Sequence, residues 1–468
     1  MNKTQVAAQS HNKQHLALII LATGLFILFF DAGAIAVAMP SLMQHFDMSL
    51  ADSQHSMAAM YTVLASCVLA AKTFCRRYTP QPILCLGLGL LFCGAMAASL
   101  ANSTALFIGA RVVQGVGGAC VAAASFSLLE FGVPPGSLHT VQRSWRTATT
   151  SAAIAGPLVG AIATQWMSWP WIWWSLAAMS ISMLAVVWSR MPAVQTTHPA
   201  SLDWIGLILS ASGIIGVVHG VIARSMTATL VSCIALLAFI VWERLRVQNQ
   251  QSALFNATKI RLSTFTSGNI SALCVSVAGH GLLMTLPIVL VSVFHLQPIE
   301  IAGVFVAAVM LSFFIETTLR HYSPWLSAVA SVVLVLGCVL MFCLHYAGLD
   351  FGLHAAGLGV FACVLVVMGL RLAHARFTQH VAVAFGTHII GIALGTALIG
   401  GLFVLELKVR GAFLHGSGGF EPGRLEYPSE LRVEVLCALM MGAVLCVVLG
   451  YFIAGLAHRY SKTHAYME

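Results

Sequence analysis

Apolar segments of about twenty residues recur along the whole chain, and this recurrence is the feature that most constrains its fold. A helix needs roughly 20 predominantly apolar residues to cross the hydrocarbon core of a membrane. With 59% of 468 residues apolar and only 8% charged, a water-soluble fold could not bury such segments. We therefore expect an all-α integral membrane protein with about fourteen transmembrane helices. The predicted segments are residues 16–39, 55–74, 82–102, 105–128, 146–165, 169–189, 203–223, 227–243, 266–294, 300–318, 323–346, 352–373, 381–405 and 433–456.

Long connections at 190–202 and 244–265 divide these segments into groups of six, two and six. We expect three parts: an amino-terminal six-helix half at 1–190, a linker with two additional transmembrane helices at 191–262, and a carboxyl-terminal six-helix half at 263–468. Turn residues are frequent in a loop at about 407–432, which we expect on the outer side. Two six-helix halves favour a central cavity that opens to each side of the membrane in turn.

The distribution of Lys and Arg predicts the orientation. With the amino terminus inside, 17 of the 23 Lys and Arg residues lie on the cytoplasmic side, as the positive-inside rule requires. We therefore expect a multi-pass protein of the bacterial inner membrane with both termini in the cytoplasm. The net charge of +8 is mostly this orientation signal, with a contribution to contacts with anionic lipid, and it does not indicate nucleic-acid binding.

One carboxylate, Asp31, lies inside the first segment, in the run LFILFFDAGAIAVAMP. A charged group at the centre of a membrane helix costs at least about 2.5 kcal/mol, so Asp31 is a candidate proton or cation site. Arg111 lies in the fourth segment at comparable depth, roughly 10 Å from the outer surface against roughly 13 Å for Asp31 at the helical rise. We expect these two to pair, directly or through water. The pair could act in function or only fix the two helices against each other.

Small residues and a proline mark helix crossings near this pair. Gln114 and Gly115 follow Arg111, and small residues at such positions let a neighbouring backbone approach closely. Gly156, Pro157 and Gly160 interrupt the fifth segment, where proline removes one backbone hydrogen bond. We expect a bend there, which is either a conformational hinge or a packing accommodation.

The remaining polar residues within the segments indicate structure more than chemistry. Most of the twelve cysteines lie within predicted helices, and none form a CxxC pair, so we expect packing and not a disulfide or zinc framework. His219, His280 and His388 also lie within segments, and each is interpreted separately as a structural hydrogen bond ahead of a proton relay. We expect no metal site.

Three motifs then resemble a known family. The helix-1 run around Asp31, the run ALFIGARVVQG around Arg111 and the run AGPLVGA with WPWIWW after it resemble the motifs of the fourteen-helix drug:proton antiporters of the major facilitator superfamily. The resemblance implies the major facilitator fold, proton coupling through Asp31 and Arg111, and an antiporter-type bend at Gly156 and Pro157. It also implies that the proton gradient supplies the energy without a cofactor. We expect a monomer whose partners are a small-molecule substrate, protons and lipid.

The chain departs from this family in two places. The connection after the second segment reads KTFCRRYTPQ at 72–81, where the family normally has GxLADRxGRK, so Arg76 replaces its aspartate and Thr79 its second glycine. Pro170 replaces the arginine of the usual WRWIF pattern. The resemblance assigns a gating role to this connection, and Arg76, Arg77 and Glu130 are the candidate gate residues. The chain therefore resembles a diverged member of this family.

The sequence therefore predicts a secondary active transporter that exports a small amphiphilic, drug-like compound in exchange for protons. Few carboxylates lie within the segments, which also suits a dedicated siderophore or metabolite exporter. The altered connection at 72–81 keeps open a membrane sensor or scaffold that does not transport. An enzyme is not expected, because no nucleophilic or metal constellation is evident.

Overall fold

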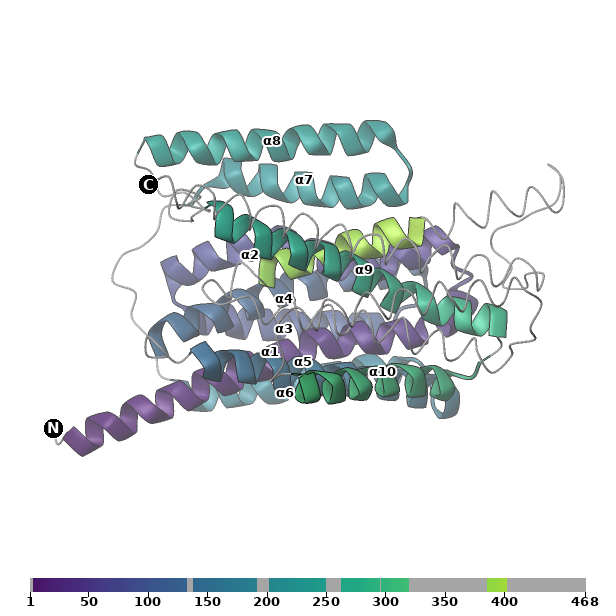
Figure 1. The fold of residues 1–468 in the computed structure, drawn as a ribbon, viewed down its shortest axis with the longest axis horizontal. Coiled ribbons are helices and arrows are strands. Elements are labelled where there is room, and N and C mark those ends of the chain that lie inside the picture. Colours follow the sequence, from purple (N-terminus) through teal and green to yellow (C-terminus); the bar gives the residue numbers. More distant parts are fainter. Residues whose placement is uncertain are drawn as a thin grey trace. The chain divides into compact units, whose positions relative to one another are not determined.

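The computed structural model describes residues 3–132, 138–191, 202–249, 262–294, 296–319 and 385–401, and these residues are almost entirely helical. The helices are α1 (Lys3–Phe46), α2 (Leu50–Tyr78), α3 (Pro80–Ser99), α4 (Thr104–Gly132), α5 (Leu138–Trp166), α6 (Pro170–Arg190), α7 (Trp204–Ile222), α8 (Met226–Gln248), α9 (Leu262–Phe294) and α10 (Pro298–Leu319) (Figure 1). A further helical stretch covers Phe385–Gly401.

Each apolar segment predicted inside the described ranges lies largely within one helix, and the segments 82–102, 169–189 and 203–223 extend one to three residues past a helix end. Eight of these helices, α1 to α8, are long and apolar enough to cross a membrane. The segments predicted at 323–346, 352–373 and 433–456, the outer loop at about 407–432 and both ends of the segment 381–405 lie outside the described residues. The all-helical fold is thus confirmed in the described part, and the count of fourteen stays a prediction.

Several helices continue beyond the apolar run that predicted them. α1 has 44 residues and α2 extends through Arg76 and Arg77 to Tyr78, so only Thr79 separates α2 from α3. Polar residues outside the hydrocarbon keep helical hydrogen bonding, and hydropathy alone therefore places a helix end too early. α6 begins at Pro170, where the missing N–H removes no helical hydrogen bond.

The described residues belong to two compact units, and three helices contribute to both. Unit 1 comprises Met1–Ala34, Ala58–Gly156 and Met167–Ile260, and unit 2 comprises Ile35–Met57, Pro157–Trp166 and Arg261–Glu468. The border between the units therefore crosses α1 after Ala34, α2 after Met57 and α5 between Gly156 and Pro157. The expected division of the chain at residues 190 and 262 concerns transmembrane topology, not compact units. It stays a prediction.

In unit 1, α3 packs against both α4 and α6. A Cβ added to Gly117 on α4 would lie 2.7 Å from the carbonyl oxygen of Gly87 on α3, so only glycine permits this crossing. The rings of Phe107 on α4 and Trp173 on α6 meet edge to face with centroids 5.0 Å apart. These contacts hold α4 in place, and α4 carries Arg111.

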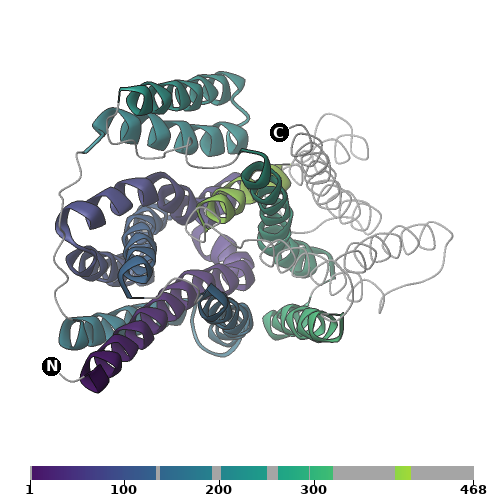
Figure 2. The same ribbon diagram turned by 60° about the vertical axis from the view of Figure 1, so that its left-hand side comes forward.

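α7 and α8 form an antiparallel hairpin within unit 1, as Figures 1 and 2 both show. Asp203 caps α7 by accepting a hydrogen bond from Gly206 N at 3.1 Å. The same carboxylate accepts from Trp242 Nε1 at 3.1 Å and pairs with Arg246 Nε at 3.3 Å. One aspartate thereby joins the start of α7 to the last turns of α8.

In unit 2, the end of α5 meets the start of α10. Gln165 Nε2 donates to Gln297 Oε1 at 2.9 Å, and the backbone N–H of Ile299 donates to Gln165 Oε1 at 3.0 Å. The side chain of Gln165 therefore satisfies one of the backbone donors that the first turn of α10 leaves without a helical partner.

The residue between α2 and α3 yields a first prediction. Thr79 has φ +82° and ψ 152°, a region that is essentially restricted to glycine and costs other residues on the order of 1–3 kcal/mol. Its side chain makes no capping hydrogen bond to α3. Thr79→Gly should therefore raise the midpoint of thermal unfolding of the protein in detergent. Thr73→Gly, inside α2, is the control and should lower it. An unchanged or lower unfolding midpoint for Thr79→Gly would contradict the claim that the backbone of Thr79 is strained.

Candidate functional site

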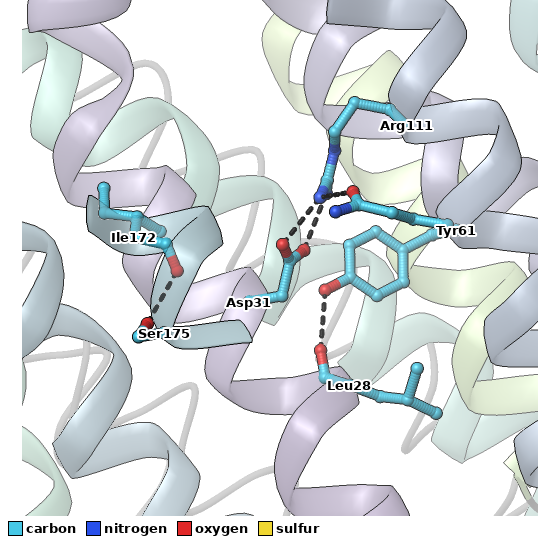
Figure 3. Close-up of polar contacts among 7 residues, drawn as sticks. Leu28, Asp31, Tyr61, Arg111, Ile172 and Ser175 are labelled. Carbon is cyan, nitrogen blue, oxygen red and sulfur yellow. Dashed lines mark hydrogen bonds and ion pairs between the residues drawn. The ribbon is translucent and has the colours of Figure 1, made fainter. Parts of the chain in front are cut away.

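Asp31 on α1 and Arg111 on α4 form a direct ion pair in unit 1 (Figure 3). Arg111 Nη1 donates to Asp31 Oδ1 at 2.6 Å, and Arg111 Nη2 donates to Asp31 Oδ2 at 2.7 Å. The side chains are 1% and 0% exposed. Two parallel hydrogen bonds of this length are the bidentate arrangement that fits a planar guanidinium to a carboxylate. The predicted pairing is therefore direct, without a bridging water.

Gln114 lies one helical turn after Arg111 and accepts a further hydrogen bond from the same guanidinium. Arg111 Nη1 also donates to Gln114 Oε1 at 2.7 Å, and Gln114 is fully buried. Among the side chains that the structure describes, Arg111 Nε and Gln114 Nε2 have no hydrogen-bond partner. The site thus retains buried donor capacity beyond the ion pair, which a polar group of a substrate or a water could use.

Tyr61 on α2 is a third neighbour, which the sequence did not indicate. Its ring is fully buried, and its hydroxyl donates to the carbonyl oxygen of Leu28 at 3.0 Å, one turn before Asp31 on α1. Figure 3 shows the phenol next to the Asp31 carboxylate, and the two interact electrostatically. A tyrosine in an apolar segment gives no signal of its own, because only the approach of α2 to α1 places it here.

Small residues allow four helices to meet around the pair. A Cβ added to Gly115 on α4 would lie 2.5 Å from the carbonyl oxygen of Met60 on α2. A Cβ added to Gly156 on α5 would lie 2.5 Å from the carbonyl oxygen of Phe30 on α1, directly beside Asp31. Both glycines therefore mark backbone contacts that no larger residue would permit. The role assigned to Gln114 and Gly115, helix packing near a coupling site, stays a prediction.

Pro157 and Gly160 follow Gly156 within α5, and both are buried. The carbonyl oxygen of Gly160 accepts a hydrogen bond from the Thr164 hydroxyl at 2.8 Å. The two residues belong to unit 2, whereas Gly156 belongs to unit 1. The hinge assigned to Gly156, Pro157 and Gly160 stays a prediction.

The candidate gate residues lie elsewhere. Arg76 and Arg77 are exposed in the last turn of α2, and the Arg77 guanidinium lies 5.5 Å from the centroid of the Tyr78 ring. Glu130 lies near the end of α4, and its side chain is outside the described residues. A gating role for these three stays a prediction. In the described ranges, no group of three or more His, Cys, Asp or Glu side chains could hold a metal ion.

Sequence comparison assigns the family. The model of the Major Facilitator Superfamily matches residues 21–401. The chain belongs to this superfamily. It is 25% identical to the drug efflux pump JefA of Mycobacterium tuberculosis over 52% of this chain and 44% of that protein. It is also 25% identical to the tetracenomycin C resistance and export protein of Streptomyces glaucescens, over 44% of this chain and 38% of that one. The chain thus matches about half or less of the length of these relatives.

A solved structure supports the fold. A bacterial homologue of the human lysosomal transporter Spinster, in an inward-facing and unoccupied conformation, aligns with a TM-score of 0.61 and 16% identity. The alignment covers 96% of this chain and 97% of that one. The major facilitator fold that the motifs implied is therefore confirmed.

The geometry of the ion pair predicts that removal of one partner destabilises the protein more than removal of both. Asp31→Asn or Arg111→Gln alone leaves a buried charge without its partner and should destabilise the protein by about 3–5 kcal/mol. The double variant Asp31→Asn/Arg111→Gln contains two neutral amides and should be more stable than either single variant. Thermal unfolding of the four proteins in one detergent measures this. A double variant whose loss equals the sum of the two single losses would contradict the coupling.

Proposed function

We propose that this protein is a secondary active transporter that exports a small amphiphilic compound in exchange for protons, by alternating access. The observation that carries the proposal is the buried bidentate pair of Asp31 and Arg111 in a chain of this superfamily. An ionisable residue inside a membrane protein is a functional candidate by default, because its burial is costly. Asp31 is the proposed proton site.

Protonation of Asp31 changes the balance of charge in the site. The carboxylate accepts two hydrogen bonds from Arg111, and a proton on it removes both the negative charge and one acceptor position. Arg111 then keeps Gln114 Oε1 and requires another acceptor for its positive charge. A polar or anionic group of the substrate, or a water, could take that place. Proton and substrate would thereby favour different states of the same site, and coupling requires such a difference.

α5 is the proposed moving element. Pro157 has no N–H, so the carbonyl of Ala153 one turn earlier receives no helical hydrogen bond from it. The border between the two compact units falls between Gly156 and Pro157. A helix that lacks one hydrogen bond at such a border can bend there at low cost. Because Gly156 contacts the backbone beside Asp31, a bend would also alter the surroundings of the carboxylate.

The substrate class is supported by the relatives and by the charges of the site. Two relatives are named for drug efflux and for tetracenomycin C export, and these names support a drug-like substrate. The described helices α9 and Phe385–Gly401 contain no Asp or Glu, which favours a neutral, zwitterionic or anionic substrate over a dication. A dedicated siderophore or metabolite exporter is therefore the second candidate. The distribution of Lys and Arg supports a bacterial inner membrane with both termini in the cytoplasm.

Transport in inverted membrane vesicles under an imposed pH gradient tests the proposal. The substrate panel contains cationic dyes and a carboxylate siderophore. Asp31→Asn should abolish pH-driven transport, because the site can no longer bind and release a proton. Asp47→Asn is the matched control, since Asp47 is exposed between α1 and α2 and asparagine tolerates its φ of +51°. This control should transport like the wild type.

Substrate counterflow without a pH gradient separates lost coupling from lost folding. Counterflow needs alternating access but no net proton movement, so Asp31→Asn should retain it. Unchanged pH-driven transport in Asp31→Asn would refute the assignment of Asp31. Siderophore transport without dye transport would favour the dedicated exporter. If the wild type transports nothing in the panel and shows no counterflow, the alternative of a sensor or scaffold gains support.

A further inference from the structure

Two buried histidines that lie far apart in the sequence meet in unit 2. His280 is near the middle of α9, and His388 is in the helical stretch Phe385–Gly401. Their ring centroids are 5.0 Å apart, the ring planes are nearly perpendicular at 80°, and the residues are 5% and 3% exposed. From the sequence alone each histidine is interpreted separately, because the sequence does not show that their helices cross.

Ser276 connects the two rings. Its hydroxyl lies 2.5 Å from His388 Nδ1, and its carbonyl oxygen lies 3.3 Å from His280 Nδ1. A carbonyl oxygen only accepts, so His280 Nδ1 carries a hydrogen in this hydrogen bond. The hydroxyl can donate to His388 Nδ1 when that atom is bare and accept from it when it is protonated. The hydrogen bond therefore persists in either protonation state.

The crossing of the two helices fixes the rings close together. A Cβ added to Gly391 would collide with the Ser276 side chain, and one added to Gly395 would collide with the backbone of Val277. A Cβ on Gly281 would likewise collide with Ile399. With so little room for the rings to separate, two positive charges would repel each other strongly in a low-dielectric environment. Two titratable groups held this close are expected to titrate as a coupled pair, in which the first proton disfavours the second.

Few charged groups of the described residues lie on the helices of this unit. α9 and Phe385–Gly401 carry no Asp, Glu, Lys or Arg, and Cys274 is the one other titratable side chain on them. α10 carries Glu300 in its first turn and Glu316 near its last. The ends of α1 and α2 in this unit carry His45, Asp47, Asp52 and His55 at or near the connection between the two helices.

We propose that Ser276, His280 and His388 form a second proton-binding site, which takes up one proton shared between the two imidazoles. Imidazole is the side chain whose charge ordinarily changes between about pH 5 and 8, so it is a suitable group for reversible proton binding. It lies on helices that carry no other strongly basic or acidic group, and Ser276 stabilises both of its states. This proposal does not rest on a role for Asp31 or on export, because proton binding by the two histidines can be measured without a transport assay.

The test is a pH titration of the histidine ring nitrogens by NMR. The full-length protein is labelled with ¹⁵N-histidine, reconstituted in lipid nanodiscs and titrated from about pH 5 to 9. His280→Gln and His388→Gln assign the two signals by their disappearance. His219→Gln is the matched control, since His219 is exposed on α7. In the wild type, both signals should move with pH and together account for one proton.

Coupling distinguishes this site from two structural hydrogen bonds. Replacement of either histidine should shift the titration midpoint of the other by about one pH unit or more. Ser276→Ala keeps both rings and should shift the midpoint of His388, and His219→Gln should leave both signals unchanged. Ring signals of the wild type that stay constant over the whole pH range would overturn the proposal. This result does not depend on the folding of any variant. Midpoints that do not change in the single variants would overturn the sharing of one proton.

Discussion

The bidentate bond between Asp31 and Arg111 is the interaction on which the rest of unit 1 depends. Burial of either charge alone would cost a large desolvation free energy. The two short hydrogen bonds between them offset much of that cost. These bonds fix the depth of α1 against α4 and the rotation of each helix about its axis. Gln114 then holds the guanidinium from a second side. The pair is therefore a strong local constraint on unit 1, and Asp31 is the proposed proton site.

Glycines make this arrangement possible, because a membrane gives little hydrophobic driving force between helices. Close backbone contacts supply dispersion instead, and Gly115 and Gly156 bring α2 and α5 against the helices that carry the pair. The same device recurs in unit 2, where Gly391 and Gly395 bring Phe385–Gly401 against α9. In both units, a small set of buried polar side chains lies at a crossing that glycine permits. Such crossings hold titratable groups in fixed geometry.

Much of this could be predicted from the sequence, and the failures have physical reasons. Hydropathy located the helices, and a rise of about 1.5 Å per residue placed Asp31 and Arg111 at similar depth. Their pairing followed, because neither charge can be buried alone. Helix ends were less predictable, since α2 continues past its apolar run to Tyr78. Tyr61 and the partnership of His280 with His388 were not predictable, because they depend on which helices touch. A family motif did locate Thr79, but only the backbone shows that it is strained.

The central claim is that Asp31 binds and releases a proton during transport. Infrared difference spectroscopy between high and low pH measures this directly, because a protonated carboxyl has a C=O stretching band that a carboxylate lacks. We expect such a band in the wild type reconstituted in lipid, its loss in Asp31→Asn and its persistence in Asp47→Asn. A band that is absent from the wild type, or that is identical in Asp31→Asn, would contradict the account.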